Sequence, residues 1–210
     1  MFTSREEAGR RLGEHLKIEG VHADIVLGLP RGGVVVAAEV ARVLEAPLDA
    51  LIVRKIGHPL YREFAVGALA ENDVVVFDPA SRRADANIRD ALERVVAEEK
   101  GRMHSYEAKF HPDGARSLES KAVLLVDDGL ATGATMEAAV LAAKKAKALS
   151  AIVAVPVAST SALDRLLQVA DDVRALLVDP EFDAVGRYYK LFSQTTDEEV
   201  MDLLHAERRH

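Results

Sequence analysis

Two adjacent carboxylates, Asp127 and Asp128, follow an apolar run and precede a stretch of small and hydroxyl-bearing residues. The run, residues 122–126, has the length and β-branched content of a buried strand. The stretch ends at Thr135, where a helical pattern begins. A strand, a turn of small residues and a helix N-terminus form an anion site, because the N–H groups of the turn and the positive end of the helix dipole converge on one point. Thr132 and Thr135 add hydroxyl donors, so we expect a phosphate here.

The aspartate pair beside this cradle indicates what carries the phosphate. Carboxylates repel a phosphate, but they accept hydrogen bonds from vicinal hydroxyls and favour a hydrated Mg²⁺ nearby. The expected ligand is therefore a sugar 5-phosphate with free hydroxyls, together with a metal. The alternative is an ordinary strand-to-helix turn with two solvated aspartates. The length of the whole block, residues 121–135, favours the ligand site.

A second strand–turn–helix unit lies nearer the N-terminus. An apolar strand is expected at residues 24–29 and a buried helix at residues 34–44. The turn between them is not a dinucleotide fingerprint, because it lacks the G-x-G-x-x-G spacing. Its only charged residue, Arg31, stands beside glycine N–H groups, a combination that suits a diphosphate. The alternative is an ordinary turn with a solvated arginine. The turn consists of Pro30, Arg31, Gly32 and Gly33.

A basic pair ends the next expected strand. This strand covers residues 47–53 and is followed by Arg54 and Lys55. The carboxyl ends of parallel strands share one rim of the sheet, so these side chains are candidates for a second clamp on a diphosphate. The alternative is a solvated basic pair. Residues 64–69 and 74–77 then read as a hairpin.

The block VLLVDDGLATGAT, residues 123–135, resembles the phosphoribosyl-pyrophosphate motif of the type I phosphoribosyltransferases. In that family the two acidic residues hold the ribose 2- and 3-hydroxyls, and the loop after them holds the 5-phosphate. The resemblance implies that Asp127 and Asp128 contact ribose. The phosphate loop that it implies comprises Gly129, Ala131, Thr132, Gly133, Ala134 and Thr135.

The turn LPRGG matches, by position and type, the loop that binds pyrophosphate in this family, often through an unusual peptide geometry. With the basic pair, the implied pyrophosphate site comprises Pro30, Arg31, Gly32, Gly33, Arg54 and Lys55. The candidate catalytic residues are Asp127, Asp128, Arg31 and Lys55.

The resemblance covers about residues 24–179 and implies a phosphoribosyltransferase. Such an enzyme transfers the 5-phosphoribosyl group of phosphoribosyl pyrophosphate to a nitrogen nucleophile, here expected to be a nucleobase, and releases pyrophosphate. Mg²⁺ is the implied cofactor, held mainly by substrate and water without direct protein ligands. Two alternatives come from other classes: a regulator that senses phosphoribosyl pyrophosphate or binds RNA without turnover, and a phosphosugar-binding subunit of a larger assembly.

One position narrows the range of acceptor bases that the enzyme could use. The hypoxanthine–guanine enzymes of this family carry an Asp immediately before the Thr-Gly pair, placed to exchange a proton with the purine. The matching residue here is Ala131, which has no proton to give or accept. A proton relay would then come from the substrate or from the lid, where His111 has an unperturbed pKa near neutrality.

A lid is expected before the signature strand. A long helix is predicted from the N-cap Asp78, with Pro79 at its first position, to about Tyr106, and a polar loop follows over residues 109–120. In the family this segment carries a mobile lid over the active site. The alternative is a solvated linker. The lid candidates are Lys109, His111 and Arg116.

The C-terminal segment has an aromatic character of its own. Residues 179–196 hold rings that could stack on a planar base, or that form a packed aromatic cluster. The capping-box spacing from Thr196 to Glu199 predicts a final helix. The base-binding candidates are Phe182, Tyr188 and Tyr189.

A first helix is expected at the N-terminus. Ser4 and Glu7 have capping-box spacing, and the helical pattern extends to about Lys17. Gly9 and Gly13 lie on adjoining turns of it. They either allow close packing or mark a weak helix, because each costs about 1 kcal/mol relative to Ala.

Composition sets the remaining limits. The chain has 210 residues, a net charge of −7 and no cysteine, which excludes disulfides and zinc–thiolate sites and argues against a broad nucleic-acid footprint. Without a signal peptide or a long apolar stretch, we expect a soluble cytoplasmic protein with no membrane partner. Strands alternating with helices predict one domain, residues 1–210: a three-layer α/β/α fold on a mainly parallel sheet. An inserted helix and lid occupy residues 79–120, and a C-terminal cap occupies residues 179–210.

Overall fold

The core is a parallel five-stranded sheet, seen in a computed structural model that describes residues 1–62, 64–78, 81 and 86–208. The strand order is β2-β1-β6-β7-β8, and each neighbouring pair is parallel. This confirms the parallel sheet predicted from the alternation of strands and helices. The strands are β1 (Ile25–Gly28), β2 (Leu48–Ala50), β6 (Ala122–Val126), β7 (Ser150–Ser159) and β8 (Asp172–Asp179).

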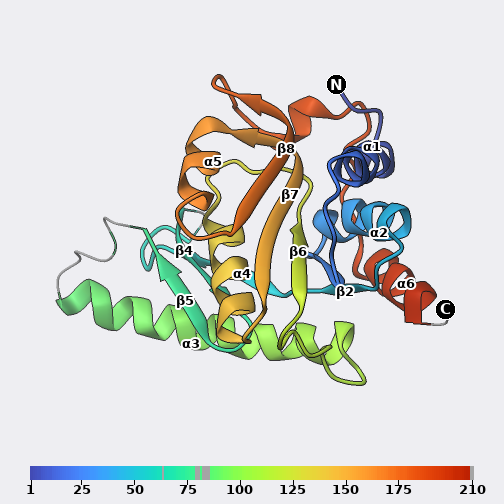
Figure 1. Cartoon of the computed structure of the whole chain (residues 1–210). Helices are drawn as coiled ribbons and strands as arrows, with labels where there is room; N and C mark the ends of the chain where they lie inside the picture. The colour runs from blue at the N-terminus through green and yellow to red at the C-terminus, as the bar shows by residue number, and fades with distance from the viewer. Residues whose placement is uncertain (63, 79–80, 82–85, 209–210) are drawn as a thin grey trace.

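Helices cover both faces of this sheet and complete the predicted three layers (Figure 1). One face carries α1 (Arg5–Ile18), α2 (Gly32–Leu44) and α6 (Asp197–Arg208), and the other carries α4 (Ala134–Lys145) and α5 (Thr160–Leu166). Successive strand residues serve opposite layers, as the two-residue period of a strand requires. Val26 and Leu124 join the core under α1 and α2, whereas Leu27 and Leu125 join the core under α4.

The helices α1 and α2 pack closely because two glycines line their contact. A Cβ on Gly9 would lie 2.6 Å from the carbonyl oxygen of Val36, and a Cβ on Gly13 would lie 2.9 Å from Cβ of Val43. Close packing is therefore the role of these glycines. The Ser4 hydroxyl accepts a hydrogen bond from the Glu7 N–H, as the capping-box spacing predicted.

A second, antiparallel sheet contains the predicted hairpin. It consists of β3 (Val53–Gly57), β4 (Ala65–Ala70) and β5 (Val74–Phe77). The single strand expected at residues 47–53 is wrong. The Leu51 N–H still donates to Gly28 in the parallel sheet, but the Ile52 N–H donates to the Glu71 carboxylate beside the hairpin. The chain changes sheets at this point, so Arg54 lies within β3 rather than after a strand end.

The inserted helix α3 (Ala86–Phe110) runs beneath the hairpin (Figure 1). The predicted start at Pro79 lies outside the described residues, and the described helix begins at Ala86. Its predicted end at Tyr106 is too early. The helix continues until Phe110 because that ring is fully buried, and Pro112 follows two residues later.

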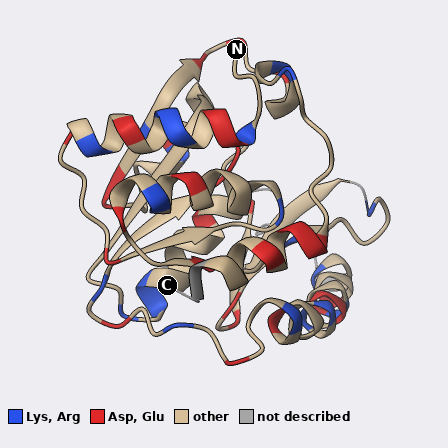
Figure 2. Cartoon of the chain, turned by 90° about the vertical axis from the view of Figure 1, so that its right-hand side faces the viewer, with Lys and Arg blue, Asp and Glu red and all other residues tan. Residues whose placement is uncertain are grey.

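Charges of both signs lie along the outer faces of α1 and α2 (Figure 2). The first turn of α6 is acidic, with Asp197, Glu198 and Glu199, where the positive end of the helix dipole stabilises carboxylates. Across the described ranges, no helix is both long enough and apolar enough to pass through a membrane.

Candidate functional site

The two strand–turn–helix units meet at one edge of the sheet. β1 and β6 are neighbours, with Gly28 paired to Val126, so the loops that follow them emerge side by side. The contact is tight. A Cβ on Gly33 would lie 2.7 Å from Asp127 Oδ1, and a Cβ on Gly32 would collide with Asp128 Oδ2. Glycine at these positions is what lets the aspartates approach the neighbouring loop.

The loop after β1 carries Arg31 at the start of α2. The peptide bond between Pro30 and Arg31 is cis, an unusual geometry of the kind that the family resemblance implied. An Nη atom of Arg31 lies 3.9 Å from Asp197 Oδ1 at the start of α6, and Lys109 Nζ lies 2.6 Å from the other oxygen of that carboxylate. Asp197 thus joins a cation of this loop to the end of α3.

The loop after β6 turns directly into α4. Gly133 has φ of +72° at the N-cap of α4, a left-handed conformation that favours glycine. The Ser159 hydroxyl donates to the Ala131 carbonyl at 2.6 Å and fixes the middle of the loop. Thr132 is exposed and Thr135 is half-buried at the start of the helix. A helix N-terminus behind a small-residue loop is the arrangement predicted to hold a phosphate.

Both aspartates lie in an environment that disfavours their charge. Burial raises the pKa of Asp127 well above its ordinary value, and the neighbouring charge of Asp128 adds to the shift. Burial also raises the pKa of Asp128, and the guanidinium of Arg5 partly offsets it. The Asp128 N–H donates to Asp127 Oδ1 at 2.8 Å and orients that carboxylate. Closely spaced groups with shifted pKa values are typical of functional sites.

Arg5 is a site residue that the sequence patterns did not identify. Its Nε donates to Asp128 Oδ2 at 2.7 Å, and an Nη donates to the Ser193 carbonyl at 2.8 Å. The capping box at Ser4 places Arg5 in the first turn of a helix, but no motif indicates where its side chain points. Only the packing of α1 against the sheet brings it to the aspartates.

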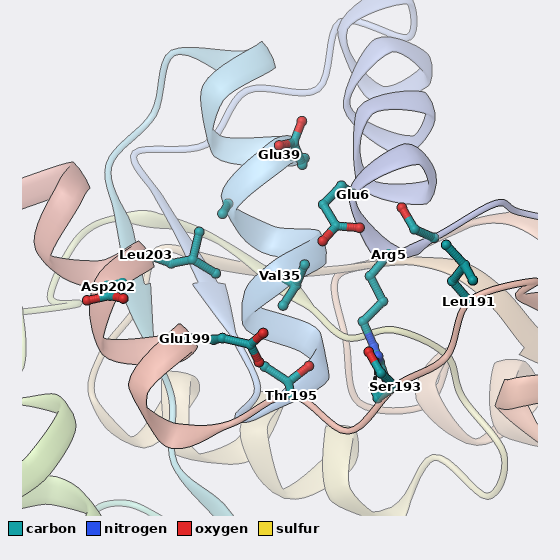
Figure 3. Close-up of a pocket in the computed structure, with 12 residues that line it drawn as sticks. Arg5, Glu6, Val35, Glu39, Leu191, Ser193, Thr195, Glu199, Asp202 and Leu203 are labelled. Atoms are coloured by element: carbon teal, nitrogen blue, oxygen red, sulfur yellow. Dashed lines mark hydrogen bonds between the residues drawn. The ribbon is translucent and has the colours of Figure 1, made fainter.

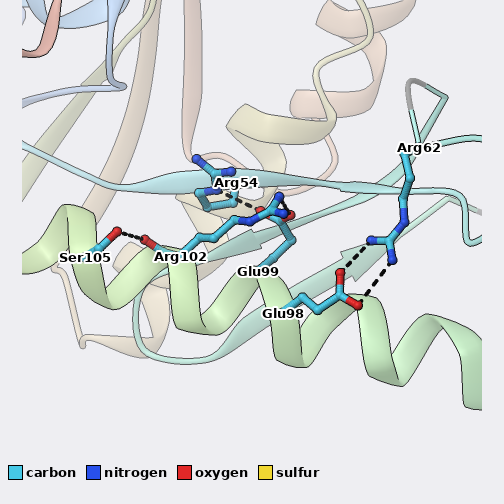
Figure 4. A network of polar contacts seen from close by, with 6 residues as sticks. All are labelled: Arg54, Arg62, Glu98, Glu99, Arg102 and Ser105. Atoms are coloured by element: carbon cyan, nitrogen blue, oxygen red, sulfur yellow. Dashed lines mark hydrogen bonds and ion pairs between the residues drawn. The ribbon is translucent and has the colours of Figure 1, made fainter.

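The structure separates the two residues of the basic pair. Lys55 is exposed, and its positive charge lowers the pKa of Asp127, after the larger effects of burial and of Asp128. Arg54 instead pairs with Glu99 of α3 at 2.8 Å, within a polar network between the hairpin and that helix (Figure 4). Glu99 also pairs with Arg102 at 2.7 Å. The geometry thus associates Lys55 with the aspartates and Arg54 with the support of the hairpin.

The C-terminal aromatics lie beside the site but are largely engaged with one another. Tyr189 is buried, packs on Phe2, and its hydroxyl donates to the Asp128 carbonyl at 2.6 Å. Phe182 and Tyr188 stack at 5.2 Å, and the Tyr188 hydroxyl donates to Asp179 at 2.6 Å. Tyr189 matches the alternative of a packed cluster, whereas Phe182 and Tyr188, next to the 3-10 helix η2 (Val185–Tyr188), are half-buried.

Two of the three lid candidates are fixed. Lys109 belongs to α3 and pairs with Asp197. His111 is buried, with Nε2 3.1 Å from Glu71 Oε1 and Nδ1 3.4 Å from Asp49 Oδ1. Burial alone lowers the pKa of His111, but the two carboxylates outweigh it and raise the pKa to about 9. This burial disfavours the proton relay expected at His111, because both ring nitrogens face carboxylates of the protein. Arg116 lies in the loop with an exposed side chain.

Asp127 and Asp128 supply carboxylate oxygens at the site, and carboxylates favour a hydrated Mg²⁺ nearby. Among the described residues, no three His, Cys, Asp or Glu side chains gather as a metal-binding group. The site therefore fits a hydrated cation beside the aspartates whose ligands come mainly from a bound substrate and water.

The mainly parallel sheet with helices on both faces is the fold of the type I phosphoribosyltransferases. The sequence profile of the family described as "Phosphoribosyl transferase domain" matches residues 6–185. The chain belongs to this family, as its sequence resemblance implied.

Known relatives agree with this assignment. Two proteins from Mycobacterium tuberculosis strains CDC 1551 and H37Rv, whose names assign them provisionally to the phosphoribosyl transferases, are 40% identical over 213 residues. The match covers 100% of this chain and 47% of each relative, so the chain spans about half of their length.

Solved structures show the same fold. The crystal structure of TT1426 from Thermus thermophilus is 44% identical, with a TM-score of 0.82 over 97% of both chains. A Neisseria gonorrhoeae protein with bound ppGpp has a TM-score of 0.52 at 16% identity, covering 98% of this chain and 96% of its own. The second likeness shows the fold alone.

Proposed function

We propose that residues 1–210 form one phosphoribosyltransferase domain that binds phosphoribosyl pyrophosphate with Mg²⁺ and transfers the 5-phosphoribosyl group to a nitrogen nucleophile. The observation that carries this proposal is the contact of the aspartate pair with the glycine loop after β1, next to the phosphate loop. One ligand that spans all three features needs a 5-phosphate, free ribose hydroxyls and a diphosphate.

The reaction breaks the bond between ribose C1 and the pyrophosphate oxygen and forms a bond from C1 to the acceptor nitrogen. Pyrophosphate leaves with both electrons of the broken bond, and its negative charge needs stabilisation. Arg31, Lys55 and the N–H groups at the start of α2 supply positive charge and donors there. Mg²⁺, when bound, neutralises diphosphate charge beside the aspartates.

Asp127 and Asp128 accept hydrogen bonds from the ribose hydroxyls and hold the ring for attack. The phosphate loop and the N-terminus of α4 hold the 5-phosphate at the opposite end of the sugar.

The acceptor is not taken up in the manner of the hypoxanthine–guanine enzymes. The residue before Thr132 and Gly133 is the exposed Ala131, and alanine cannot exchange a proton with a purine. General acid–base help of the usual size, about 10²–10⁴-fold, is therefore missing at this position. We expect a nucleobase other than hypoxanthine or guanine.

A pyrophosphate-release assay tests this function. Adenine, hypoxanthine, guanine, uracil and orotate are compared at saturating phosphoribosyl pyrophosphate and Mg²⁺. We expect turnover with a base other than hypoxanthine and guanine, and both of these below a kcat/KM of about 10⁴ M⁻¹s⁻¹. Efficient use of either would show that Ala131 does not determine the acceptor.

Calorimetry provides the matched binding control. Asp128→Asn keeps the side-chain shape but removes a charged acceptor, so affinity for phosphoribosyl pyrophosphate should fall by about 1.5–3 kcal/mol. Tight binding without pyrophosphate release from any base would favour the non-catalytic sensor. Equal affinity of the wild type and the Asp127→Asn/Asp128→Asn variant would contradict the site itself.

A further inference from the structure

We propose that Arg5 is a positioning residue for ribose recognition, which holds one carboxylate oxygen of Asp128 so that the other is presented to the sugar. This inference rests on the proposed function, because it assigns Asp128 a ribose hydroxyl. It adds the N-terminal helix to a site otherwise built from the loops after β1 and β6.

The side chain of Arg5 is fixed by three contacts from two parts of the chain. Its Nε lies 2.7 Å from Asp128 Oδ2, and both side chains are largely buried, at 11% and 15% exposure. One Nη donates to the Ser193 carbonyl at 2.8 Å, and the guanidinium carbon lies 3.9 Å from the centre of the Phe192 ring. Figure 3 shows Arg5 extending from the start of α1 towards Ser193. A side chain held in this way imposes its geometry on the carboxylate that it binds.

The pairing is selective for one aspartate and one oxygen. Arg5 contacts Oδ2 of Asp128, whereas Asp127 Oδ1 is oriented by the Asp128 N–H. The Tyr189 hydroxyl fixes the Asp128 main chain through its carbonyl. The backbone and one side-chain oxygen of Asp128 are thus held by protein, and Oδ1 is the atom that we assign to the ligand.

Arg5 also supplies charge where two carboxylates are crowded. Asp127 and Asp128 are buried side by side, and this burial raises the pKa of each carboxyl group. Arg5 and Lys55 are the cations that act on Asp127, and Arg5 acts on Asp128, while Tyr189 lies next to the pair with Glu7 close to its hydroxyl. A protonated Asp128 would be a poorer acceptor for a sugar hydroxyl, so the ion pair favours the binding form.

The glycine loop is shaped around this ion pair. A Cβ on Gly32 would collide with Asp128 Oδ2 and lie 2.7 Å from Arg5 Nε. The loop assigned to pyrophosphate therefore contacts the Arg5–Asp128 pair directly. This contact places the pair inside the ligand site rather than on a remote surface.

The test compares Arg5→Met and Arg5→Lys with the wild type by calorimetry, using phosphoribosyl pyrophosphate, ribose 5-phosphate and inorganic pyrophosphate, each with Mg²⁺. Arg5→Met keeps an apolar stem on Phe192 but removes the charge. We expect it to weaken both ribose ligands by about 10-fold or more, as for the loss of a charged hydrogen bond, and to change pyrophosphate affinity less than about 2-fold. Arg5→Lys should restore part of the loss.

Arg10→Met is the matched control, because Arg10 lies on the same helix with a half-exposed side chain, 3.9 Å from Glu39. It should leave all three affinities unchanged. Tighter binding by Arg5→Met would mean that Arg5 competes with the ligand, and an equal loss for all three ligands would mean a general structural role; both overturn the inference. If the wild type binds neither ribose ligand, the result contradicts the proposed function itself and not only the role of Arg5. Normal wild-type binding with an unaffected Arg5→Met variant refutes the role of Arg5 alone.

Discussion

Asp127 illustrates at the scale of one residue how a binding site opposes stability. Its burial and the adjacent charge of Asp128 raise its pKa, so the folded protein holds the ionised carboxylate less readily than the unfolded chain does. An acid whose pKa is raised on folding destabilises the fold at every pH above its unfolded value. This free-energy penalty grows as the pH rises from the unfolded pKa to the folded pKa, and it is constant at higher pH. A ligand that donates hydrogen bonds to this carboxylate recovers part of that free energy.

Asp127→Asn is therefore expected to stabilise the free protein at pH 8 while weakening phosphoribosyl pyrophosphate binding. The amide removes the buried charge and keeps an oxygen for the Asp128 N–H. We expect a gain on the order of 1 kcal/mol in the free energy of unfolding, typical of a single stabilising substitution. Urea denaturation at pH 8 and pH 4 measures it. The gain should shrink at pH 4, near the ordinary pKa of an aspartate. A loss of stability at pH 8 would contradict this account of the charge.

The residues of the site were predictable to the extent that local motifs encode them. The aspartates and the phosphate loop lie in one contiguous block, and their spacing alone indicates their arrangement. The role of Arg5 was not predictable, because the local sequence does not show whether an arginine in the first turn of a helix is exposed or buried. Tyr189 was identified as aromatic, but whether it packs or stacks on a ligand depends on Phe2, far away in the sequence.

At the scale of elements, the contact between α1 and α2 sets the position of Arg5. The two helices approach closely because Gly9 and Gly13 lack side chains where they cross. A helix held at this distance delivers its first turn to the carboxyl edge of the sheet.

Gly9→Ala should destabilise the protein by about 1–3 kcal/mol, because the new methyl group would lie 2.6 Å from the Val36 carbonyl oxygen. Gly101→Ala is the matched control in α3, where a Cβ meets no described heavy atom within 4 Å. That substitution should instead stabilise by about 1 kcal/mol through helix propensity. Urea denaturation of both variants measures the difference. The packing role is ruled out if both variants gain stability.

Element boundaries were less predictable than element types. The run from residue 47 to residue 53 is largely apolar, so the pattern does not reveal that the chain leaves one sheet and enters another after Ala50. The deciding contact is the hydrogen bond from the Ile52 N–H to Glu71, 19 residues away. Likewise, α3 continues beyond Tyr106 because the side chain of Phe110 is buried, and helical periodicity alone does not predict this burial.

At the scale of the whole molecule, His111 connects parts that share no sheet. Asp49 lies in β2, Glu71 follows the hairpin strand β4, and His111 follows α3. The Arg116 N–H adds a bond to Asp49 at 3.2 Å. One buried imidazolium thus joins the parallel sheet, the hairpin and the loop before β6.

This connection predicts a loss of stability at alkaline pH. The pKa of His111 is about 9 in the folded protein and near 6.5 when unfolded, so its contribution is complete below pH 6.5 and is lost as the pH rises through 9. The change is on the order of 3 kcal/mol. His111→Gln should make the free energy of unfolding less dependent on pH over this range, as measured by urea denaturation. His22→Gln, at an exposed ion pair, should retain the wild-type slope. If the free energy of unfolding changes with pH equally in all three proteins, a group other than His111 causes the pH dependence.

Segments far apart in the sequence meet beside Asp127 and Asp128, and this has a consequence for how the protein is made. The main chain of Phe2 forms hydrogen bonds with Tyr188 and Lys190, on either side of Tyr189, and Arg5 is anchored by Ser193. Ser159, which fixes the middle of the phosphate loop, is synthesised before Ser193, which anchors Arg5. All five strands of the parallel sheet end by Asp179, so a nascent chain contains the whole sheet before it contains the residues that hold Asp128 in its final setting. On the proposed function, we expect ribose affinity to arise late in the synthesis of this domain, so that a chain interrupted before residue 193 retains phosphate donors without full recognition of the sugar.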